Sequence, residues 1–434
     1  MKPTRGSGRA ARLVLPLAVS LFACAASAAT LIHAGRVIDG VSDTVRTNQT
    51  VVVEGGRITA LEAGFRSPAA GDRVIDLRNG TLLPGFIDAH VHLSGQQSRR
   101  TEIERYTLNE ADQAIDAVVF ANRTLLAGFT TVRDLGDGSG AVIALAKAVQ
   151  AGKVPGPRII AAGKPIGSTG GHADPTSGWS RVIEPVGDLE DAVVDSPDAA
   201  RKAVRQRYKE GARTIKIMAS AGVLSLETHS GNPQMTEEEI RAVVQTAHDY
   251  DLKVAAHAHG AEAIKRAIRG GVDSIEHGTF MDDEGIKLMK EHGTIYVPTL
   301  TAAKWVNDMA QDPTFFPEVI RPKALEVGPQ IRRTLAKAYK AGVKIMFGTD
   351  SGVSPHGSNA QEFALMVEAG VPPMQAIRAA TSVPARFLGL NDTGSIEVGK
   401  LAELAGVPGD PLSDISVMQQ VVFVMKDNTV YKAP

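Results

Sequence analysis

The first and last parts of the chain carry short apolar runs that are broken by turn residues, a pattern typical of small β-strands. Residues 50–61 are one example, with Gly55-Gly56 at the expected hairpin turn, and the last apolar runs flank a turn at Asp427-Asn428. We therefore predict that residues 29–84 and 391–434 combine into one composite β domain, a small β-sandwich that uses both chain ends.

Residues 85–390 instead alternate apolar segments with stretches of helical periodicity. The expected helices include residues 110–127, 236–250 and 282–292, and Thr236 with Glu239 forms a capping box at the start of the second. The expected strands lie at residues 85–93, 130–136, 158–163, 214–220, 253–260, 274–278, 295–300 and 344–352. Eight strands that alternate with helices favour an α/β fold of the TIM type, a closed (β/α)8 barrel over residues 85–390, rather than an open sheet.

The first thirty residues have a different pattern. Four basic residues precede an apolar run at residues 13–24, and Ala26-Ser27-Ala28 follows as a possible A-x-A cleavage site. The pattern predicts that residues 1–28 are a signal peptide and that the mature chain is exported, either to a periplasm or out of the cell. The apolar run is too short to remain in a bilayer as a spanning helix, so no stable membrane anchor is expected.

Composition narrows the partners and the chemistry. Lys and Arg number 47 against 48 Asp and Glu, a net charge of −1, so no nucleic-acid partner is expected. Cys24 is the only cysteine and falls within the predicted signal peptide. The mature chain would then have no disulfide, no thiolate ligand and no cysteine nucleophile, and any metal ion must be bound by histidine, carboxylate or a less usual ligand.

Histidines gather at the ends of predicted strands. His90 and His92 end the first strand, and His257 and His259 end the fifth. Because residues i and i+2 of a strand point to the same face, each pair places two imidazoles side by side. A hydrogen-bonded pair of core histidines is the simple alternative. With His277 at the end of the sixth strand, however, five of the eleven histidines lie at strand ends, which favours a metal site at the carboxyl ends of the barrel strands.

Two further residues belong to this set. Asp350 ends the eighth strand, and Lys216 lies inside the apolar fourth strand. A buried ammonium must be paired, deprotonated or modified, because burying a bare charge is costly. An ion pair with a neighbouring Asp or Glu is the ordinary explanation. Beside metal ligands a second one is open, in which the neutral amine takes up carbon dioxide to form a carbamate whose two oxygens bridge two cations.

Several segments, in their order along the chain, resemble the amidohydrolase superfamily. They are GFIDAHVHL, TTVRDLG, IKIMAS, VAAHAHG, SIEHG, FGTDSG, ATSVPARFLGL and GDPLSD. The chain is most similar to the imidazolonepropionase-like branch, which contains Xaa-Pro dipeptidases, carboxypeptidase-like dipeptidases and ochratoxin-cleaving amidases. The resemblance extends from Leu31 to the C-terminus and includes every metal-ligand position.

The resemblance implies two Zn²⁺ ions, or other divalent metals, bridged by N6-carboxylated Lys216. The implied ligands of one ion are His90, His92 and Asp350, and those of the other are His257 and His277. It also implies catalytic roles for Lys216, as the bridge, and for Asp350, as the group that carries the proton. His259 is then left either as a neighbour that supports the metal ligands or as a residue that faces the substrate.

Substrate contacts are less defined. His172 lies in the loop of residues 167–179 and is a candidate for contacting the substrate, although a surface position is equally open. Arg181, His229 and Arg321 are, with His172, candidates for binding a substrate carboxylate. The aromatic residues of 301–325 either form a lid over an apolar group or pack onto the barrel.

We therefore expect a binuclear zinc amidohydrolase that cleaves the amide bond to a C-terminal amino acid in dipeptides or N-acyl amino acids, including ochratoxin A. A cyclic-amide hydrolase or deaminase of the same superfamily is one alternative, but those branches often use one metal ion and lack the lysine at Lys216. A non-catalytic, exported metal-binding protein is the other, against which Asp350 argues because binding alone needs no proton shuttle. The expected partner is a small-molecule amide, and a homo-oligomer is expected because relatives are commonly multimeric.

Overall fold

The computed structural model describes residues 1–4, 6, 28–180, 182 and 191–434. Most of the predicted signal peptide, residues 1–28, lies outside the described residues, as does Arg181. Within the described ranges, no helix combines the length and the apolar character that crossing a membrane requires.

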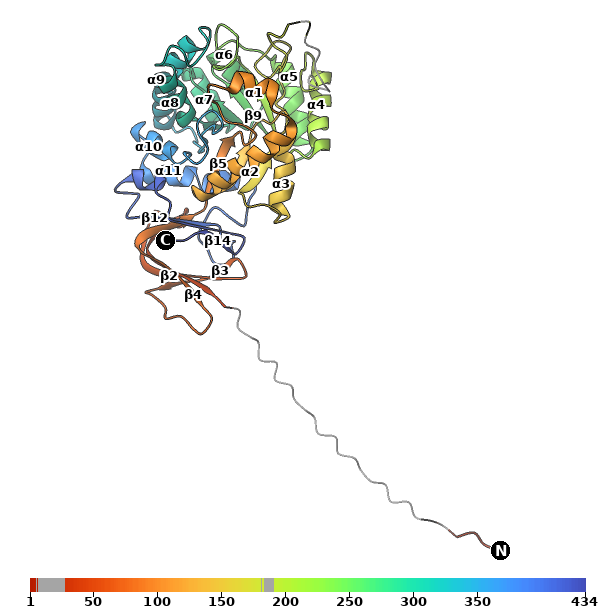
Figure 1. Cartoon of the computed structure of the whole chain (residues 1–434), viewed down its shortest axis with the longest axis vertical. Helices are drawn as coiled ribbons and strands as arrows, with labels where there is room; N and C mark the ends of the chain where they lie inside the picture. Colours follow the sequence, from red (N-terminus) through yellow and green to blue (C-terminus); the bar gives the residue numbers. More distant parts are fainter. Residues whose placement is uncertain (5, 7–27, 181, 183–190) are drawn as a thin grey trace.

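Strands and helices alternate through the middle of the chain, while its two ends are mainly strands (Figure 1). The strands are β1 (Thr30–Val37), β2 (Arg46–Glu54), β3 (Arg57–Ala63), β4 (Arg73–Pro84), β5 (Phe86–Val91), β6 (Phe129–Asp134), β7 (Arg158–Ala161), β8 (Thr214–Met218), β9 (Lys253–Ala258), β10 (Ser274–His277), β11 (Ile295–Val297), β12 (Leu404–Pro408), β13 (Phe423–Lys426) and β14 (Thr429–Lys432). The helices are α1 (Thr101–Thr107), α2 (Glu110–Leu126), α3 (Ala141–Gln150), α4 (Pro197–Glu210), α5 (Glu237–His248), α6 (Ala261–Gly270), α7 (Asp283–His292), α8 (Leu300–Met309), α9 (Arg321–Lys340), α10 (Gln361–Glu368), α11 (Pro373–Ala379) and α12 (Ser382–Phe387), and Ile415–Gln419 is a 3-10 helix.

Strands from both chain ends share one seven-stranded sheet in the order β14-β13-β12-β4-β1-β2-β3. The sequence predicts a small β-sandwich here, and the described strands of both ends are joined by hydrogen bonds into this one sheet. This sheet curls, because its two edges approach each other: Ile58 N–H donates to Lys400 O at 2.9 Å, and Gly56 N–H donates to Asn428 Oδ1 at 3.1 Å. Val53 and Phe423, from opposite ends of the sheet, consequently share one buried core.

The parallel strands form two arcs, β5-β6-β7 and β8-β9-β10-β11. Isolated parallel bridges connect these arcs to each other and to the segment 344–352, at Ile166–Ile217, Tyr296–Ile345 and Val91–Ser351. The mixed α/β fold expected from the sequence is confirmed, and the hydrogen-bonded order is the one that a (β/α)8 barrel requires. How the chain divides into domains stays a prediction, although β4 ends at Pro84 and β5 begins at Phe86.

The eighth predicted strand, residues 344–352, forms bridges rather than a continuous ladder. Thr349 N–H donates to the carboxylate of Asp88, at 3.1 Å, instead of to a neighbouring strand. Asp350 has a φ of 57°, which no regular strand allows. The seventh predicted strand, 295–300, is also shorter than expected, because α8 begins at Leu300. Three helices agree with the sequence (α2, α5 and α7), including the capping box at Thr236 and Glu239.

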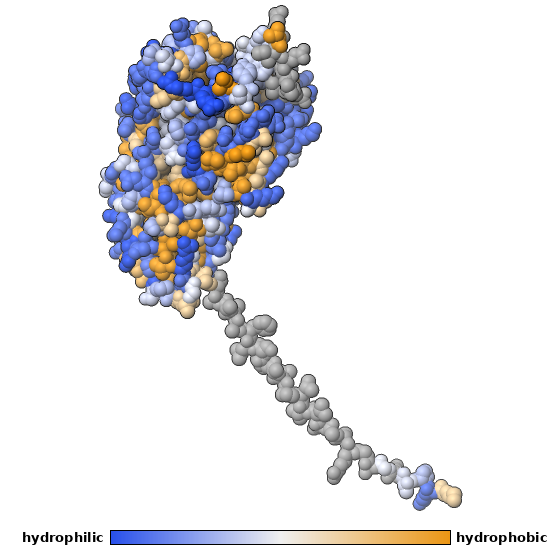
Figure 2. Space-filling view, in the orientation of Figure 1, coloured by the Kyte–Doolittle hydropathy of each residue, from blue (hydrophilic) through white to orange (hydrophobic). Residues whose placement is uncertain are grey.

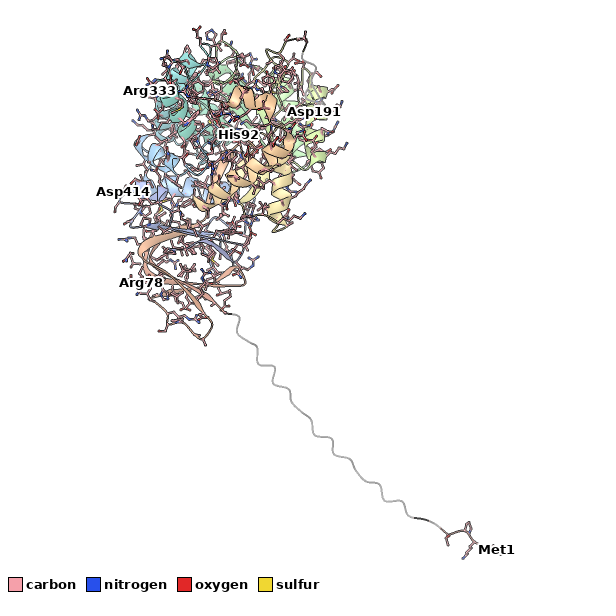
Figure 3. The ribbon with its side chains drawn as sticks, viewed as in Figure 1. Met1, Arg78, His92, Asp191, Arg333 and Asp414 are labelled. Carbon is pink, nitrogen blue, oxygen red and sulfur yellow. The ribbon has the colours of Figure 1, made fainter. Side chains whose placement is uncertain are left out.

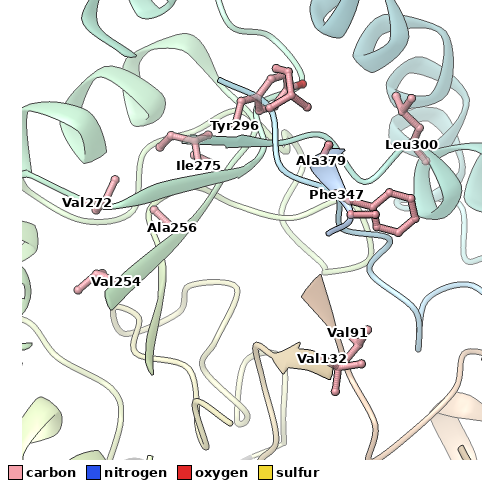
Figure 4. Close-up of a cluster of buried hydrophobic side chains, with 14 of the residues drawn as sticks. Val91, Val132, Val254, Ala256, Val272, Ile275, Tyr296, Leu300, Phe347 and Ala379 are labelled. Carbon is pink, nitrogen blue, oxygen red and sulfur yellow. The ribbon is translucent and has the colours of Figure 1, made fainter. Parts of the chain in front are cut away.

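The core of the strand layer is apolar on both faces. Figure 4 shows Val254, Ala256 and Ile275 together on neighbouring strands, with Val91 and Val132 on the opposite arc. Every residue of β5, β6, β8 and β10 is buried, as expected for parallel strands covered by helices. Polar side chains within these strands are therefore costly unless they are paired, and these are the residues that build the site.

Candidate metal centre

The six predicted metal ligands converge at the carboxyl ends of the parallel strands. They are His90 and His92 at the end of β5, Lys216 in β8, His257 in β9, His277 in β10, and Asp350 in the segment 344–352. Lys216 Nζ lies 3.2 Å from His90 Nε2, and Asp350 Oδ1 lies 3.1 Å from His92 Nε2. The rings of His257 and His277 are 4.6 Å apart between centroids. Figure 3 shows His92 in the middle of the helical part of the molecule, far from Arg78 on the terminal sheet.

Neighbouring groups fix the orientation of the imidazoles. The Nδ1 atoms of His90, His92 and His277 lie 2.9, 3.0 and 2.8 Å from Glu276 Oε2, Gly136 O and Thr299 Oγ1. Each of these rings therefore turns its Nε2 atom toward the centre of the cluster. In His257 the Nε2 atom is the one engaged, 3.2 Å from Ala221 O, so Nδ1 is the atom left for a ligand. Such partners are typical of metal-binding histidines.

His259 lies as close to the cluster as the predicted ligands do. Ligand atoms of His257, His259 and His277 all lie within 4.8 Å of one another, as do those of His90, His277 and Asp350. His259 Nδ1 is held at 2.8 Å by Thr279 Oγ1, and its ring stacks on His277. The prediction that His257 binds metal while His259 faces the substrate therefore rests on the family pattern and not on these distances.

A buried ion pair supports the cluster and was not found from the sequence. Glu276 contacts His90 through Oε2 and accepts a hydrogen bond from Arg133 Nη2 through Oε1, both at 2.9 Å. Both charged side chains are fully buried. Arg133 also donates to Ala89 O and to Ser274 Oγ. Both residues are visible in the sequence as polar positions in the otherwise apolar strands TTVRDLG and SIEHG. Only the fold shows that their side chains meet.

Burial sets the protonation of the cluster. It lowers the pKa of His90 to about 4, with Lys216 adding to the effect, and it lowers the pKa values of His257 and His277 far below the ordinary range. Burial alone would raise the pKa of Asp350, but His90 and His92 outweigh it and hold this pKa at about 2. At neutral pH the imidazoles of His90, His257 and His277 are thus neutral and the Asp350 carboxylate is ionised, the forms that bind a metal ion. His92 differs: burial acts to lower its pKa, but the contact with Asp350 outweighs burial and raises it.

Lys216 is buried without an acidic partner. Burial lowers its pKa to about 8, although Glu276 and Asp350 act in the opposite direction. Within the described part of the chain, its Nζ atom has one polar contact, with His90 Nε2. Among the described residues, no Asp or Glu forms the ion pair that would be the ordinary explanation for this lysine.

The donor set fits divalent metal ions. Imidazole nitrogens and carboxylate oxygens are the usual ligands of zinc and related metals. The rings are oriented by other groups, the binding atoms point at one another, and the lysine forms no ion pair with a described carboxylate. The residues present therefore fit a metal centre, in which His90, His92, His257, His277 and Asp350 would be the ligands.

A cavity of about 1050 Å³ opens above the cluster. Its wall includes all six predicted ligands together with His172, His259 and Thr299. The apolar part of the wall comes from the segment after β8 and from α8 and α9, through Val223, Leu224, Leu226, Val306, Val327 and Ile331. The cavity is large enough to bury a small amide substrate.

His172 is held over the cluster by the loop that follows β8. Its ring lies 4.6 Å from that of His257, and a Cβ atom added at Gly222 would lie only 2.2 Å from its Cε1 atom. Its backbone N–H donates to Gln234 Oε1, and Gln234 Nε2 donates to Glu227 Oε1. Its buried Nδ1 atom has no hydrogen-bond partner among the residues that the structure describes.

Lys323, a buried residue of α9, anchors the same loop. Its Nζ atom donates to three carbonyl oxygens, those of Gly222, Ser225 and Glu227, at 3.1, 2.7 and 2.6 Å. No sequence pattern marks this lysine, because its three acceptors are backbone groups about 100 positions away in the chain.

Two predicted carboxylate-binding residues do not line the cavity. Arg321 Nε donates to Ala310 O at 2.9 Å, which joins the start of α9 to the end of α8. His229 is exposed on the loop after β8. The aromatic residues of the predicted lid pack on one another: Trp305 and Phe315 meet edge to face at 5.6 Å, and Phe315 meets Phe316 at 4.8 Å. They belong to α8 and the turn that follows it and are absent from the cavity wall.

The sequence profile of the amidohydrolase family matches residues 81–432, and the chain belongs to this family. Ochratoxinase of Aspergillus niger is 30% identical to it, over 93% of this chain and 87% of the relative. A solved Xaa-Pro dipeptidase with methionine bound in the active site is 49% identical, with a TM-score of 0.90 over 94% of this chain and 100% of that one. A prolidase complexed with N-methylphosphonate-L-proline is 34% identical, with a TM-score of 0.85 and the same coverage. The protein is therefore a hydrolytic enzyme that acts on amide bonds.

Proposed function

We propose that the protein is a binuclear metal-dependent hydrolase, with zinc as the expected metal, that cleaves the amide bond to a C-terminal amino acid. The observation that carries the proposal is Lys216, a buried lysine that faces His90 Nε2 and forms no ion pair with any described acidic residue. A carbamate on its Nζ atom would supply a negative charge and two oxygens with which to bind two cations. This explains why the lysine lies among neutral imidazoles rather than beside an acid.

Bound divalent cations lower the pKa of a water molecule and polarise a carbonyl group. The chain supplies the rest of the chemistry. Asp350 is held ionised against His92 and lies at the floor of the cavity, so its carboxylate can accept a proton and pass it to the leaving nitrogen. The histidine ligands would hold the cations beside this carboxylate, within the wall of the same cavity.

Dipeptides and N-acyl amino acids are the proposed substrate class. The Xaa-Pro dipeptidase, the prolidase and the ochratoxinase to which the chain is similar support it. The cavity supports it as well, because its wall combines apolar side chains with the buried Nδ1 atom of His172, which has no hydrogen-bond partner among the described residues. Such a cavity suits an acyl group or side chain joined to a polar amino acid.

Both alternatives meet an observation that disfavours them. A one-metal cyclic-amide hydrolase or deaminase has no use for an unpaired buried lysine such as Lys216. A non-catalytic metal-binding protein has no use for a cavity of about 1050 Å³ above its metal ligands.

Export after removal of residues 1–28 and self-association are part of the proposal. Apolar side chains lie exposed on α1 and α2, where no described element covers Ile103, Tyr106, Ile115 or Val119. Figure 2 shows hydrophobic residues gathered over this side of the molecule. A second copy of the chain would bury them, and the molar mass in solution tests this.

The deciding experiment measures metal content and lysine modification on the purified protein and then screens substrates. The screen includes dipeptides varied at the C-terminal residue, N-acyl amino acids including ochratoxin A, and cyclic amides. About two metal ions per chain and release of a C-terminal amino acid are the expected result. One metal ion, an unmodified Lys216 and turnover of rings alone would favour the cyclic-amide alternative. Bound metal without any turnover would favour the non-catalytic one.

A further inference from the structure

Backbone strain is concentrated at the metal centre. Among the described residues, seven other than glycine have a positive φ, and five of these are Asn or Asp, which tolerate the left-handed region. The other two are His277, with φ 69°, and Thr299, with φ 54°. Both line the cavity. Thr299 is β-branched, for which this conformation is strained by about 1–3 kcal/mol, so the surrounding structure must hold it there.

Thr299 is the N-cap of α8, but its side chain does not cap the helix. An N-cap threonine normally accepts a hydrogen bond from a backbone N–H of the first turn. Here the left-handed backbone turns the hydroxyl away from the helix, and Oγ1 lies 2.8 Å from Nδ1 of His277. The threonine thus gives up the usual capping contact and contacts a predicted metal ligand.

Glu362 of α10 provides the cap in place of Thr299. Its carboxylate accepts hydrogen bonds from Leu300 N–H at 2.9 Å, from Thr301 N–H at 2.6 Å and from the Thr301 hydroxyl at 2.7 Å. These N–H groups belong to the first turn of α8, which has no partners for them within the helix. Glu362 is fully buried, so the first turn of α8 is fixed directly after Thr299.

His277 is also held through its own backbone. The Tyr296 hydroxyl donates to His277 O at 2.7 Å, and the Tyr296 ring lies so close to Gly278 that a Cβ atom there would be 2.6 Å from it. The backbone of His277 is therefore set by Tyr296, while the rotation of its ring depends on Thr299.

We infer that Thr299 and Glu362 are positioning residues for the metal ligand His277. Glu362 takes over the capping of α8, which frees the Thr299 hydroxyl to hold Nδ1 of His277 and to direct its Nε2 atom at the metal centre. The inference rests on the proposed function, in which His277 is a ligand. It adds two residues outside the predicted ligand set. Thr299 contacts His277 directly, whereas Glu362 acts only by fixing the turn that follows Thr299.

The test uses variants that separate the hydroxyl from the shape of the side chain. Thr299→Val keeps the β-branched shape and its backbone strain but loses the hydroxyl, whereas Thr299→Ser keeps the hydroxyl. Thr299→Ala is a second variant without the hydroxyl and with less strain, for use if the valine variant does not fold. Thr301→Val is the control for Glu362, because it removes one donor to the carboxylate without changing either backbone donor.

The measurement is the affinity of the metal-free full chain for Zn²⁺, titrated against a chromophoric chelator after circular dichroism has confirmed the fold. Loss of a partner of a metal-binding histidine typically weakens affinity by about 10–100-fold. We expect that loss in Thr299→Val and Thr299→Ala, near-wild-type affinity in Thr299→Ser, and weaker binding in Glu362→Gln. Thr301→Val is expected to unfold more easily but to keep its affinity for the metal.

The outcomes distinguish this inference from the proposed function. Wild-type affinity in the folded variants that lack the Thr299 hydroxyl would overturn the inference while leaving the enzyme's proposed function intact. Equal losses in Thr299→Ser and Thr299→Val would also overturn it, because packing and not the hydroxyl would then be responsible. If the wild-type chain itself binds no Zn²⁺, the proposed function fails first.

Discussion

The buried pair Arg133–Glu276 allows a prediction whose size follows from the structure. The substitution Glu276→Gln keeps the shape of the side chain but removes its charge. Arg133 would then remain fully buried, with neutral hydrogen-bond acceptors at Ala89 and Ser274 but without an anion. Breaking a buried ion pair by removing one partner costs about 3–5 kcal/mol of stability, because the other charge stays uncompensated.

The pKa of Glu276 gives a second route to the same magnitude. Burial alone would raise this pKa, but Arg133 and His90 outweigh it and hold it at about 2, below the ordinary 4.5. A depression of this size corresponds to roughly 3 kcal/mol. Because the pKa is depressed in the folded state, this stabilisation is fully present above pH 4.5 and is lost as the pH falls toward 2.

The assay is guanidinium unfolding of the metal-free protein, so that metal binding does not contribute. At pH 7 we expect Glu276→Gln to lower the free energy of unfolding by about 3–5 kcal/mol, with the difference from wild type shrinking below pH 4.5. Glu403→Gln is the matched control, since its partner Arg158 keeps 32% of its side chain exposed and can be hydrated when the charge is removed. A loss below about 1 kcal/mol, the value typical of an exposed pair, or a difference that does not change with pH would refute the reasoning.

Three further predictions concern turnover. Lys216→Ala should abolish turnover, and short carboxylic acids that replace the carbamate should restore part of it. If this variant turns over substrate at the wild-type rate without added acid in a hydrolysis assay, Lys216 has no bridging role. Asp350→Asn should keep much of its metal, as measured by elemental analysis. Its kcat should fall by about 10²–10⁴-fold, the usual contribution of a general acid or base. A near-normal kcat would mean that another group carries the proton. Gly222→Ala should push the His172 ring out of place, because the new Cβ would lie 2.2 Å from it. A raised KM with a smaller change in kcat is expected there, and an unchanged KM would show that His172 does not contact the substrate.

The strand ends were predictable because their pattern is local. His90 and His92 lie two positions apart at the end of one apolar run, and the same spacing recurs at His257 and His259, so the sequence alone places these side chains on one face. The fold class followed from the same alternation of apolar strands and helices. Both predictions rest on patterns that extend over only a few neighbouring residues. They therefore did not require knowing which distant segments of the chain come together.

The groups that orient the ligands were not predictable, because they come from elsewhere in the chain. Glu276 lies 186 positions from His90, and Glu362 lies 61 positions from Thr301. Thr299 appeared in the sequence as part of a strand, because its left-handed backbone depends on Glu362 and His277 rather than on its neighbours. The positions of Arg321 and His229 away from the cavity were hidden for the same reason: their surroundings are set by how α9 and the loop after β8 pack.

Two buried carboxylates show how the fold holds its strained ligands. Asp88 accepts hydrogen bonds from Thr349 N–H and from the Thr349 hydroxyl, directly before the left-handed Asp350. Glu362 does the same for the turn directly after the left-handed Thr299. Burial raises the pKa values of Asp88 and Glu362 to about 6 and 8, and each carboxylate is therefore an unfavourable group to bury as an anion. A core of the same shape without these acids would avoid that cost but would leave both turns without acceptors. These two carboxylates therefore reduce stability, but their hydrogen bonds hold Asp350 and Thr299 in left-handed conformations that neither residue would adopt on its own.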